Sequence, residues 1–291
     1  GEIVGVSVGP KGTYFIQSDM TTPTPTSHVK RIDSEGRVKT VSKDLWAYET
    51  AKNPDGRKVY GFTDLNKRCA ADLAAFEKDN AAAELPPLSK YRGIIESHGY
   101  QTTVHHGDVY VADAAANAIL QVDEHSGRIR TVAVIPATPI TFSADIAAML
   151  EEATGLDLPD CLAGARFVPE PVPTDVKVGK DGTLYVSTLQ GWLGEPLPLS
   201  SVWRVDAKSG KAAKVASGMH GATGLDLIGE DIFVAEMFGG EVSVIKNGKG
   251  RVRTLFTLPE AADVSTKGST IYASAGVFAA PGSIVSYKYT R

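Results

Sequence analysis

The sequence predicts an all-β fold, a β-propeller with two short helical insertions, and two observations support this prediction. A short alternating strand, a turn that contains glycine and a second strand centred on an aromatic residue recur five times along the 291 residues. In four of the five copies a third alternating segment follows, and a polar turn that contains glycine joins it to a fourth. Four antiparallel strands in about 40 residues have the size and order of one propeller blade. We therefore expect a single propeller domain over residues 1–291.

The five repeats are placed along the chain by their first residue and by their aromatic residue. The copies begin at Gly5, Thr102, Asp175, Gly224 and Asp263, and their aromatics are Tyr14, Tyr110, Tyr185, Phe233 and Tyr272. The third and fourth strands after the first four copies are expected in HVKRIDSEGRVKTV, AILQVDEHSGRIRTVAVI, SVWRVDAKSGKAAKVA and EVSVIKNGKGRVRTLF. The last copy ends in SIVSYKYTR, a third strand without a clear fourth.

Two insertions lengthen the spacing between the first three repeats. They span about residues 44–100 and 136–171. The first predicts a helix around residues 69–83. The second predicts a helix around residues 143–153, because apolar side chains there lie at helical spacing and Gly155 can end the helix.

The two cysteines fall one in each insertion and fit no metal-ligand spacing. Cys69 and Cys161 therefore form either one disulfide between the insertions or two buried thiols.

Composition and charge argue against two classes of partner. The chain has 30 basic and 34 acidic residues, a net charge of -4 and no cluster of Lys or Arg, so nucleic acid is not an expected partner. No stretch approaches the ~18 continuous apolar residues of a membrane-spanning helix. With 43% hydrophobic and 22% charged residues, the composition is that of a globular protein.

The candidate site lies where the first strands of the blades begin and the second strands end, because ligands of propellers bind on that face. We expect His98 to act as a general base, oriented by Glu236 or Asp113. Further ligand contacts are expected from Asp113, Thr174, Asp175, Thr223 and Trp192. Carboxylates from different loops suit Ca²⁺ or Mg²⁺, which makes Asp113, Asp175 and Glu236 candidate metal ligands.

A structural reading of the same residues stays open. Acids and hydroxyls in blade loops often close Asx turns or cap backbone N–H groups, which would account for Asp113, Thr174, Asp175 and Thr223. Trp192 could equally pack beneath its own loop, QGWLGEPLPL.

Three segments strongly resemble the ScyD/ScyE family, secreted bacterial propellers that are associated with scytonemin biosynthesis and widespread in actinobacteria. They are SHGYQTTVHHGDVYVADAAANAILQVDEHSGRIRTVAVIP, DLPDCLAGARFVPEPVPTDVKVGKDGTLYVSTL and GATGLDLIGEDIFVAEMFGGEVSVI. LWAYETAKNPDG, from Leu45, is similar to that family's helix before the first insertion. The resemblance covers nearly the whole chain and implies an exported, NHL-like propeller with a disulfide between the insertions. It implies no reaction.

The family pattern is longer at the N-terminus by about one blade. A family-like ring would have six blades, and five repeats are visible here. We therefore expect that the first blade is absent and that the open edges could take a second chain or self-associate, because unpaired strand edges invite association.

Three functions follow from these observations. The first is a secreted binding or interaction module that presents its top face to a small molecule, a glycan or a protein. The second is a metal-assisted lyase or lactone hydrolase with His98 as base. The third is a structural component of an extracellular assembly, which pairing of the open edges with another chain would favour.

Overall fold

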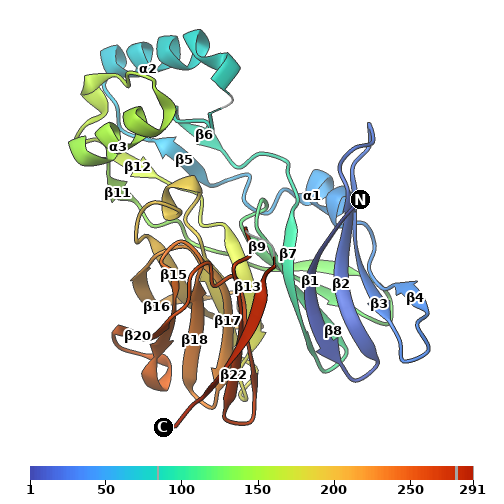
Figure 1. The fold of residues 1–291 in the computed structure, drawn as a ribbon. Coiled ribbons are helices and arrows are strands. Elements are labelled where there is room, and N and C mark those ends of the chain that lie inside the picture. The colour runs from blue at the N-terminus through green and yellow to red at the C-terminus, as the bar shows by residue number, and fades with distance from the viewer. Residues whose placement is uncertain (84, 279–280, 291) are drawn as a thin grey trace. The chain divides into compact units, whose positions relative to one another are not determined.

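The computed structural model describes residues 1–83, 85–278 and 281–290, and the chain forms two compact units (Figure 1). Unit 1 comprises Gly1–Pro54, Ile95–Pro136 and Pro171–Arg291, and unit 2 comprises Asp55–Ile94 and Ala137–Glu170. The two insertions thus form a compact unit of their own, with somewhat narrower limits than the expected 44–100 and 136–171. Antiparallel sheets dominate the structure, which confirms the predicted all-β propeller class.

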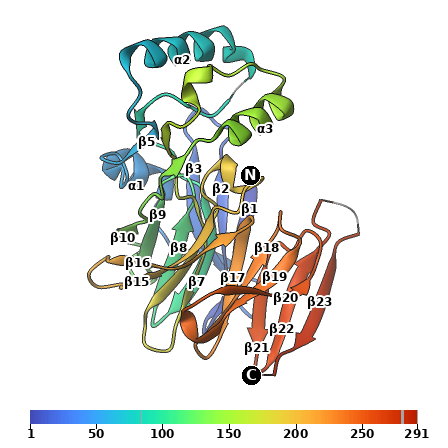
Figure 2. The same cartoon turned by 90° about the vertical axis from the view of Figure 1, so that its left-hand side faces the viewer.

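Unit 1 holds five antiparallel sheets, which we number as blades one to five (Figure 2). Blade one is β1 (Glu2–Gly9), β2 (Gly12–Asp19), β3 (Thr26–Ile32) and β4 (Val38–Thr40). Blade two is β7 (Gly99–His105), β8 (Asp108–Asp113), β9 (Ala118–Asp123) and β10 (Ile129–Val134). Blade three is β13 (Pro173–Val178), β14 (Leu184–Thr188), β15 (Ser200–Val205) and β16 (Ala212–Met219). Blade four is β17 (Ala222–Ile228), β18 (Asp231–Glu236), β19 (Glu241–Ile245) and β20 (Val252–Thr257), and blade five is β21 (Val264–Lys267), β22 (Thr270–Ala275) and β23 (Ser283–Lys288).

The blades pack in sequence through their first strands. β1 contacts β7, β7 contacts β13, β13 contacts β17 and β17 contacts β21. The repeated aromatic on the second strand of blades one to four packs against the next blade, which explains its recurrence in the sequence. Tyr14, Tyr110 and Phe233 are buried in this way and Tyr185 is half-buried. Tyr272 of blade five has no following blade among the described residues and is 40% exposed.

The two end sheets of unit 1 expose apolar side chains. On blade one, Ile3 is 62% and Val8 is 81% exposed, and on blade five Ile284 is 70% exposed. β1 pairs with β2 in antiparallel register, so the N-terminal strand belongs to blade one and does not complete blade five. Within the described residues of unit 1, the five sheets agree in number with the five repeats counted in the sequence.

Short helices accompany the blades of unit 1. α1 (Leu45–Lys52) forms in the predicted LWAYETAK segment and contacts β3. Its N-cap, Asp44, accepts hydrogen bonds from the backbone N–H groups of Trp46 and Ser27, which fixes the helix start to blade one. The 3₁₀ turns η3 (Trp192–Gly194) and η4 (Lys246–Gly248) lie in loops of blades three and four.

Unit 2 is built from both insertions. Its sheet has the order β11 (Ile140–Thr141), β12 (Arg166–Val168), β5 (Val59–Phe62) and β6 (Tyr91–Arg92), so each insertion supplies two strands. The predicted helices are confirmed as α2 (Lys67–Asp79), followed by η1 (Ala81–Ala83), and α3 (Ala144–Thr154), which Gly155 ends in the left-handed conformation. A 3₁₀ turn, η2 (Asp160–Leu162), precedes β12.

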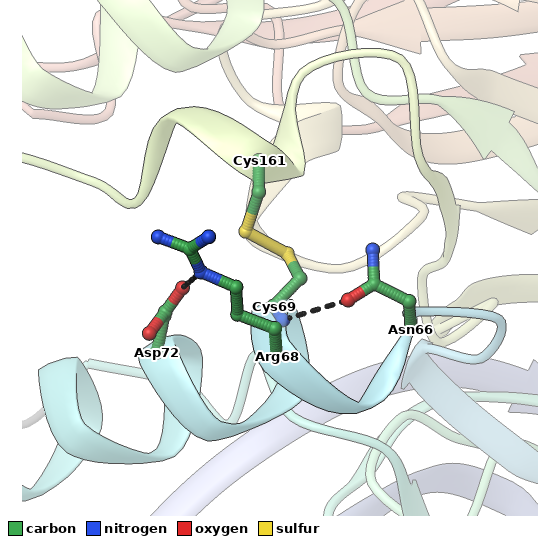
Figure 3. The surroundings of a disulfide bond; sticks show 5 residues. All are labelled: Asn66, Arg68, Cys69, Asp72 and Cys161. Atoms are coloured by element: carbon green, nitrogen blue, oxygen red, sulfur yellow. Dashed lines mark hydrogen bonds and ion pairs between the residues drawn. A yellow bond between two sulfur atoms is a disulfide. The ribbon is translucent and has the colours of Figure 1, made fainter.

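A disulfide joins Cys69 of α2 to Cys161 of η2 (Figure 3). The two Cα atoms are 5.8 Å apart, within the ordinary range for such a bond. Asn66 caps α2 by accepting a hydrogen bond from the Cys69 N–H at 3.0 Å, which fixes the first turn that carries the sulfur. Of the two alternatives left open by the sequence, the disulfide is therefore the one observed.

No helix in the described part of the chain combines the length and apolarity needed to cross a membrane.

Candidate functional site

The Asp113 side chain makes hydrogen bonds to the segment that begins its own blade and does not face an open pocket. Its carboxylate is fully buried and accepts hydrogen bonds from the Ser97 hydroxyl (2.7 Å) and from the N–H groups of His98 (2.8 Å) and Ala116 (3.2 Å). Burial raises the pKa of Asp113, and these donors oppose the rise. The arrangement ties the segment before β7 to the turn after β8.

Glu236 has the corresponding role in blade four. Its Oε2 atom accepts a hydrogen bond from the His220 N–H at 2.7 Å, and burial raises the pKa of the side chain. His220 was not singled out from the sequence. A signal was present: a His-Gly pair opens the first strand in both blades, and an acid follows the histidine by 15 residues in one blade and 16 in the other.

Thr174 and Thr223 link neighbouring blades. The Thr174 hydroxyl lies 2.8 Å from the Ala222 carbonyl oxygen of β17, to which it donates, and 2.8 Å from the Ser187 hydroxyl. The Thr223 hydroxyl donates to the Ala262 carbonyl oxygen of blade five at 2.7 Å. Both threonines are the second residue of the first strand in their blade. The same position of the repeat therefore donates a hydrogen bond to the next blade in both cases.

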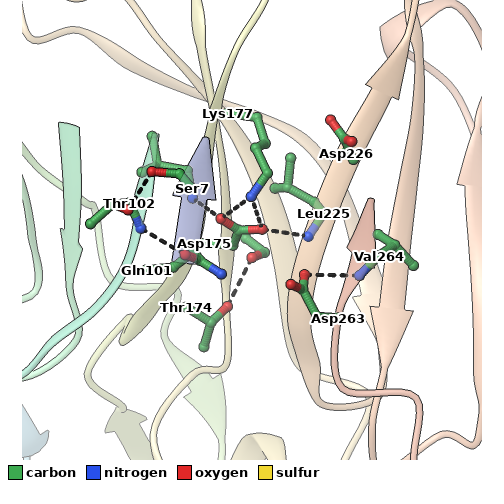
Figure 4. A network of polar contacts seen from close by, with 12 residues as sticks. Ser7, Gln101, Thr102, Thr174, Asp175, Lys177, Leu225, Asp226, Asp263 and Val264 are labelled. Carbon is green, nitrogen blue, oxygen red and sulfur yellow. Dashed lines mark hydrogen bonds and ion pairs between the residues drawn. The ribbon is translucent and has the colours of Figure 1, made fainter. Parts of the chain in front are cut away.

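Asp175 and Lys177 form a buried ion pair on β13 (Figure 4). The Lys177 ammonium lies 2.6 Å and 2.7 Å from the two carboxylate oxygens of Asp175. Asp175 also accepts a hydrogen bond from the Leu225 N–H of β17 at 2.8 Å. The pair therefore joins blades three and four at their first strands.

The carboxylates of Asp226 and Asp263 also act on the charge of Lys177. Asp226 on β17 accepts the Thr266 N–H at 2.6 Å, and Asp263 precedes β21 and accepts the Val264 N–H at 2.8 Å. Gly224 permits the close approach of Asp263, because a Cβ atom at Gly224 would overlap the Asp263 side chain. We call Asp175, Lys177, Asp226 and Asp263 the inner-strand cluster.

Burial and charge together set the protonation of the inner-strand cluster. The pKa of Asp175 is raised to about 7, and burial is the main cause. The positive charge of Lys177 opposes this rise and the negative charge of Asp263 adds to it. Burial also raises the pKa of Asp263. Burial would lower the pKa of Lys177, but Asp175, Asp263 and Asp226 outweigh it and raise that pKa. One ammonium among three carboxylates thus stays charged, while an acid of the cluster exchanges its proton near neutral pH.

The imidazole of His98 lies beside a different acid from the two that we expected. Its Nε2 atom is 3.3 Å from a Glu2 carboxylate oxygen, whereas the bond from His98 to Asp113 comes from the backbone. The His98 and Tyr100 rings meet edge to face, with centroids 5.9 Å apart. Burial, Asp263, Glu2 and Asp175 all raise the pKa of Tyr100, so its phenol lies close to the acids of the first strands.

Trp192 is half-buried in η3, in a loop that the backbone holds in place. Val172 and Gln190 adopt positive φ values of 51° and 74°, which are strained for residues other than glycine. The Leu189 N–H donates to the Val172 carbonyl at 3.0 Å, and the Gln190 N–H donates to the Pro171 carbonyl at 3.1 Å. These bonds hold the base of the Trp192 loop against the start of β13.

The structure does not gather the expected metal ligands into one site. Across the residues that are described, no group of three or more His, Cys, Asp or Glu side chains is placed to hold a metal ion. Asp113 and Glu236 accept hydrogen bonds from backbone N–H groups at the start of their own blades, and Asp175 accepts one from the neighbouring blade.

Two exposed aromatic rings lie on the face where second strands end. Phe238 follows β18 and is 37% exposed, and Phe278 follows β22 and is 68% exposed. Their ring centroids are 6.3 Å apart. Phe238 lies where a side chain at Gly221 would be, and the Phe278 N–H donates to Glu260 at 3.1 Å. This top-face aromatic pair was not predicted, because single aromatics in loops produce no periodic pattern.

Comparisons with known proteins identify the fold. No protein-family model matches the chain, and no curated protein matches it. The crystal structure of a nidogen/laminin complex matches with a TM-score of 0.52 and 10% identity, over 94% of this chain and 72% of that chain. The structure of a protein proposed to be a gluconolactonase matches with a TM-score of 0.50 and 12% identity, over 94% and 71%. Both are likenesses of fold.

Proposed function

We propose that this propeller is a secreted interaction module and that it binds a protein partner on its top face. The top-face aromatic pair is the observation that supports this proposal, since exposed neighbouring apolar side chains on strand-end loops are typical of recognition surfaces. Aromatic residues supply a large contact area at little cost in side-chain entropy.

The acidic and hydroxyl side chains near this face stabilise the blades that carry it. Asp113, Glu236, Thr174 and Thr223 all bind groups of the chain itself, within a blade or between blades. Hydrogen bonds of this kind fix the loops that present a binding surface, and a fixed surface loses less entropy when a partner binds.

Export is supported by the disulfide and by the resemblance to the ScyD/ScyE family. Disulfides persist in oxidising compartments and are rare in the cytosol of most organisms. The Cys69–Cys161 bond therefore fits an extracellular protein of the kind found in that actinobacterial family.

Paired variants test the top-face proposal. The chain and a Phe238→Ser, Phe278→Ser variant are immobilised and exposed to secreted proteins of the source organism, and retained proteins are quantified by mass spectrometry. Val38→Ser is the matched control, because Val38 is an exposed apolar residue on β4. We expect a protein that the native chain and the control retain and the double variant loses. Equal retention by all three, or retention of glycans or small molecules alone, would contradict a protein-binding top face.

A second candidate function is acid–base chemistry by a metal-assisted lyase or lactone hydrolase. The position of the His98 ring beside the Glu2 carboxylate, next to Tyr100, favours it, because a histidine near a carboxylate can act as a general base. Hydrolysis of glucono-δ-lactone is measured with added Ca²⁺ or Mg²⁺ for the native chain, His98→Ala and, as control, His28→Ala. Activity lost only in His98→Ala would support an enzyme, and no activity above buffer would count against it.

A further inference from the structure

We infer that a cavity between blades three and four, at the end of the blades opposite the top face, binds a neutral sugar residue of a glycan. The cavity has a volume of about 420 Å³, within the range of small-molecule sites, and is lined by Lys180, Asp181, Tyr185, Glu230 and Asn247. The inference goes beyond the proposed function, because both the site and the class of ligand differ from those of the top face.

Three turns of the two neighbouring blades form the walls of the cavity. Residues 179–183 join β13 to β14, and Gly229 and Glu230 join β17 to β18. η4, which joins β19 to β20, supplies Asn247. The antiparallel pairing places these turns where the first strands end, whereas the top face lies where the first strands begin. The cavity is therefore separate from the top-face aromatic pair.

Tyr185 departs from the other repeated aromatics, and the cavity explains the difference. Tyr14 and Phe233, at the same position of blades one and four, are fully buried, and Tyr110 is 6% exposed. Tyr185 is only half-buried. Its hydroxyl makes no hydrogen bond to the described residues, and burial, Asp181 and Glu230 raise its pKa, which keeps the hydroxyl protonated. Tyr185 therefore offers a ligand both an apolar ring and a free donor.

The side chains around Tyr185 offer further donors and acceptors. Among the residues that the structure describes, Lys180 and Glu230 pair with no opposite charge and the Asn247 amide has no partner. The Asn247 N–H donates to Asp231 at 2.8 Å, which holds this residue at a positive φ of 53°.

Asp181 is fixed in place by Thr183. The Thr183 N–H donates to one carboxylate oxygen of Asp181 at 3.0 Å, and the Thr183 hydroxyl donates to the other at 2.9 Å. Each carboxylate oxygen can accept a second hydrogen bond, so Asp181 remains able to bind a ligand.

The combination of charges favours a neutral ligand over an ion. Lys180 would repel a cation, and Asp181 and Glu230 would repel an anion. A sugar carries several hydroxyl groups, each of which donates and accepts, and its C–H groups can pack on the Tyr185 ring. A free amino acid also carries both charges, and it is therefore the competing ligand in the test.

Saturation-transfer NMR on the full chain tests the inference. The neutral probes are maltotriose, mannotriose and chitotriose, and alanine and glucuronate represent zwitterions and anions. Tyr185→Phe removes only the hydroxyl, and phenylalanine fits this position of a blade, as Phe233 shows. Asn247→Gly removes the amide and retains a residue that adopts positive φ readily. Tyr110→Phe, which removes a phenol at the same position of blade two, is the matched control.

We expect at least one neutral probe to bind the native chain and the Tyr110→Phe control equally. Tyr185→Phe should weaken this binding about threefold to tenfold, because one hydrogen bond is lost, and Tyr185→Phe, Asn247→Gly should weaken it further. The Phe238→Ser, Phe278→Ser variant should bind the same probe normally, so failure of the top-face proposal would leave this result intact. Three outcomes would overturn the inference: no binding of any neutral probe, binding that the Tyr185→Phe, Asn247→Gly variant retains in full, or binding of alanine or glucuronate alone.

Discussion

Raising the pH from about 5 to about 8 should weaken the folded state, because Asp175 loses a proton inside the inner-strand cluster. Its pKa is about 7 in the folded chain and 3.8 ordinarily. Between these values the folded state binds more protons than the unfolded state, so the free energy of unfolding falls as the pH rises and levels off above the folded pKa. The full shift corresponds to about 4 kcal/mol, of which about 2–3 kcal/mol falls between pH 5 and 8.

Comparison with Asp175→Asn reports the contribution of the neighbouring acids Asp175 and Asp263, because the charge of Asp263 raises the pKa of Asp175 and their titrations are linked. Asparagine still accepts a hydrogen bond from the Leu225 N–H but does not titrate. Burial raises the pKa of Asp113 and Glu236 as well, and these more distant groups titrate in both proteins.

Urea unfolding measures the effect at several pH values. Tryptophan fluorescence provides the signal, and Trp203, which is buried between blades two and three, contributes to it. The native chain should lose about 2–3 kcal/mol more than Asp175→Asn over this range. Equal slopes for the two proteins, or a native chain that gains stability relative to the variant as the pH rises, would refute the reasoning.

Three other perturbations have defined outcomes. Replacing Cys69 and Cys161 with serine removes a bond that spans 92 sequence positions and should lower the free energy of complete unfolding by about 4–5 kcal/mol in urea titrations; unchanged stability would contradict a structural disulfide. Lys177→Met leaves the carboxylates of the inner-strand cluster without a counter-charge and should cost about 3–5 kcal/mol near neutral pH, and less in acid. Thr223→Val removes the bond to the Ala262 carbonyl and should cost about 1 kcal/mol, with faster amide exchange in blade five; faster exchange in blade one alone would argue against a link between blades four and five.

The blades could be predicted because their signals are local. Alternation along each strand and an aromatic on the second strand appear within some 15 residues, and in the first four blades this aromatic packs on the next blade. The sheet of unit 2 could not be predicted in this way. β6 and β11 have two residues each, too few for alternation, and Phe167 of one insertion pairs with Phe62 of the other.

The positions of the candidate residues along their strands could be predicted, but their hydrogen-bond and charge partners could not. The sequence places Asp113, Asp175 and Glu236 at strand starts and ends, and the structure finds them there. Their partners come from other strands: Lys177 meets acids of β17 and of the segment before β21, and Gly224 matters only because Asp263 approaches it. Contacts of this kind depend on how neighbouring blades pack, and a short segment of sequence holds no information about that packing.

The bond between Cys69 and Cys161 also closes the polypeptide into a covalent ring. All four strands of blade two, from Gly99 to Val134, lie inside that ring. A protease that cuts the backbone anywhere between the two cysteines, in any turn of blade two, would therefore open the loop without releasing a fragment. A chain cut once in this region would remain one covalently linked molecule for as long as the disulfide stays oxidised.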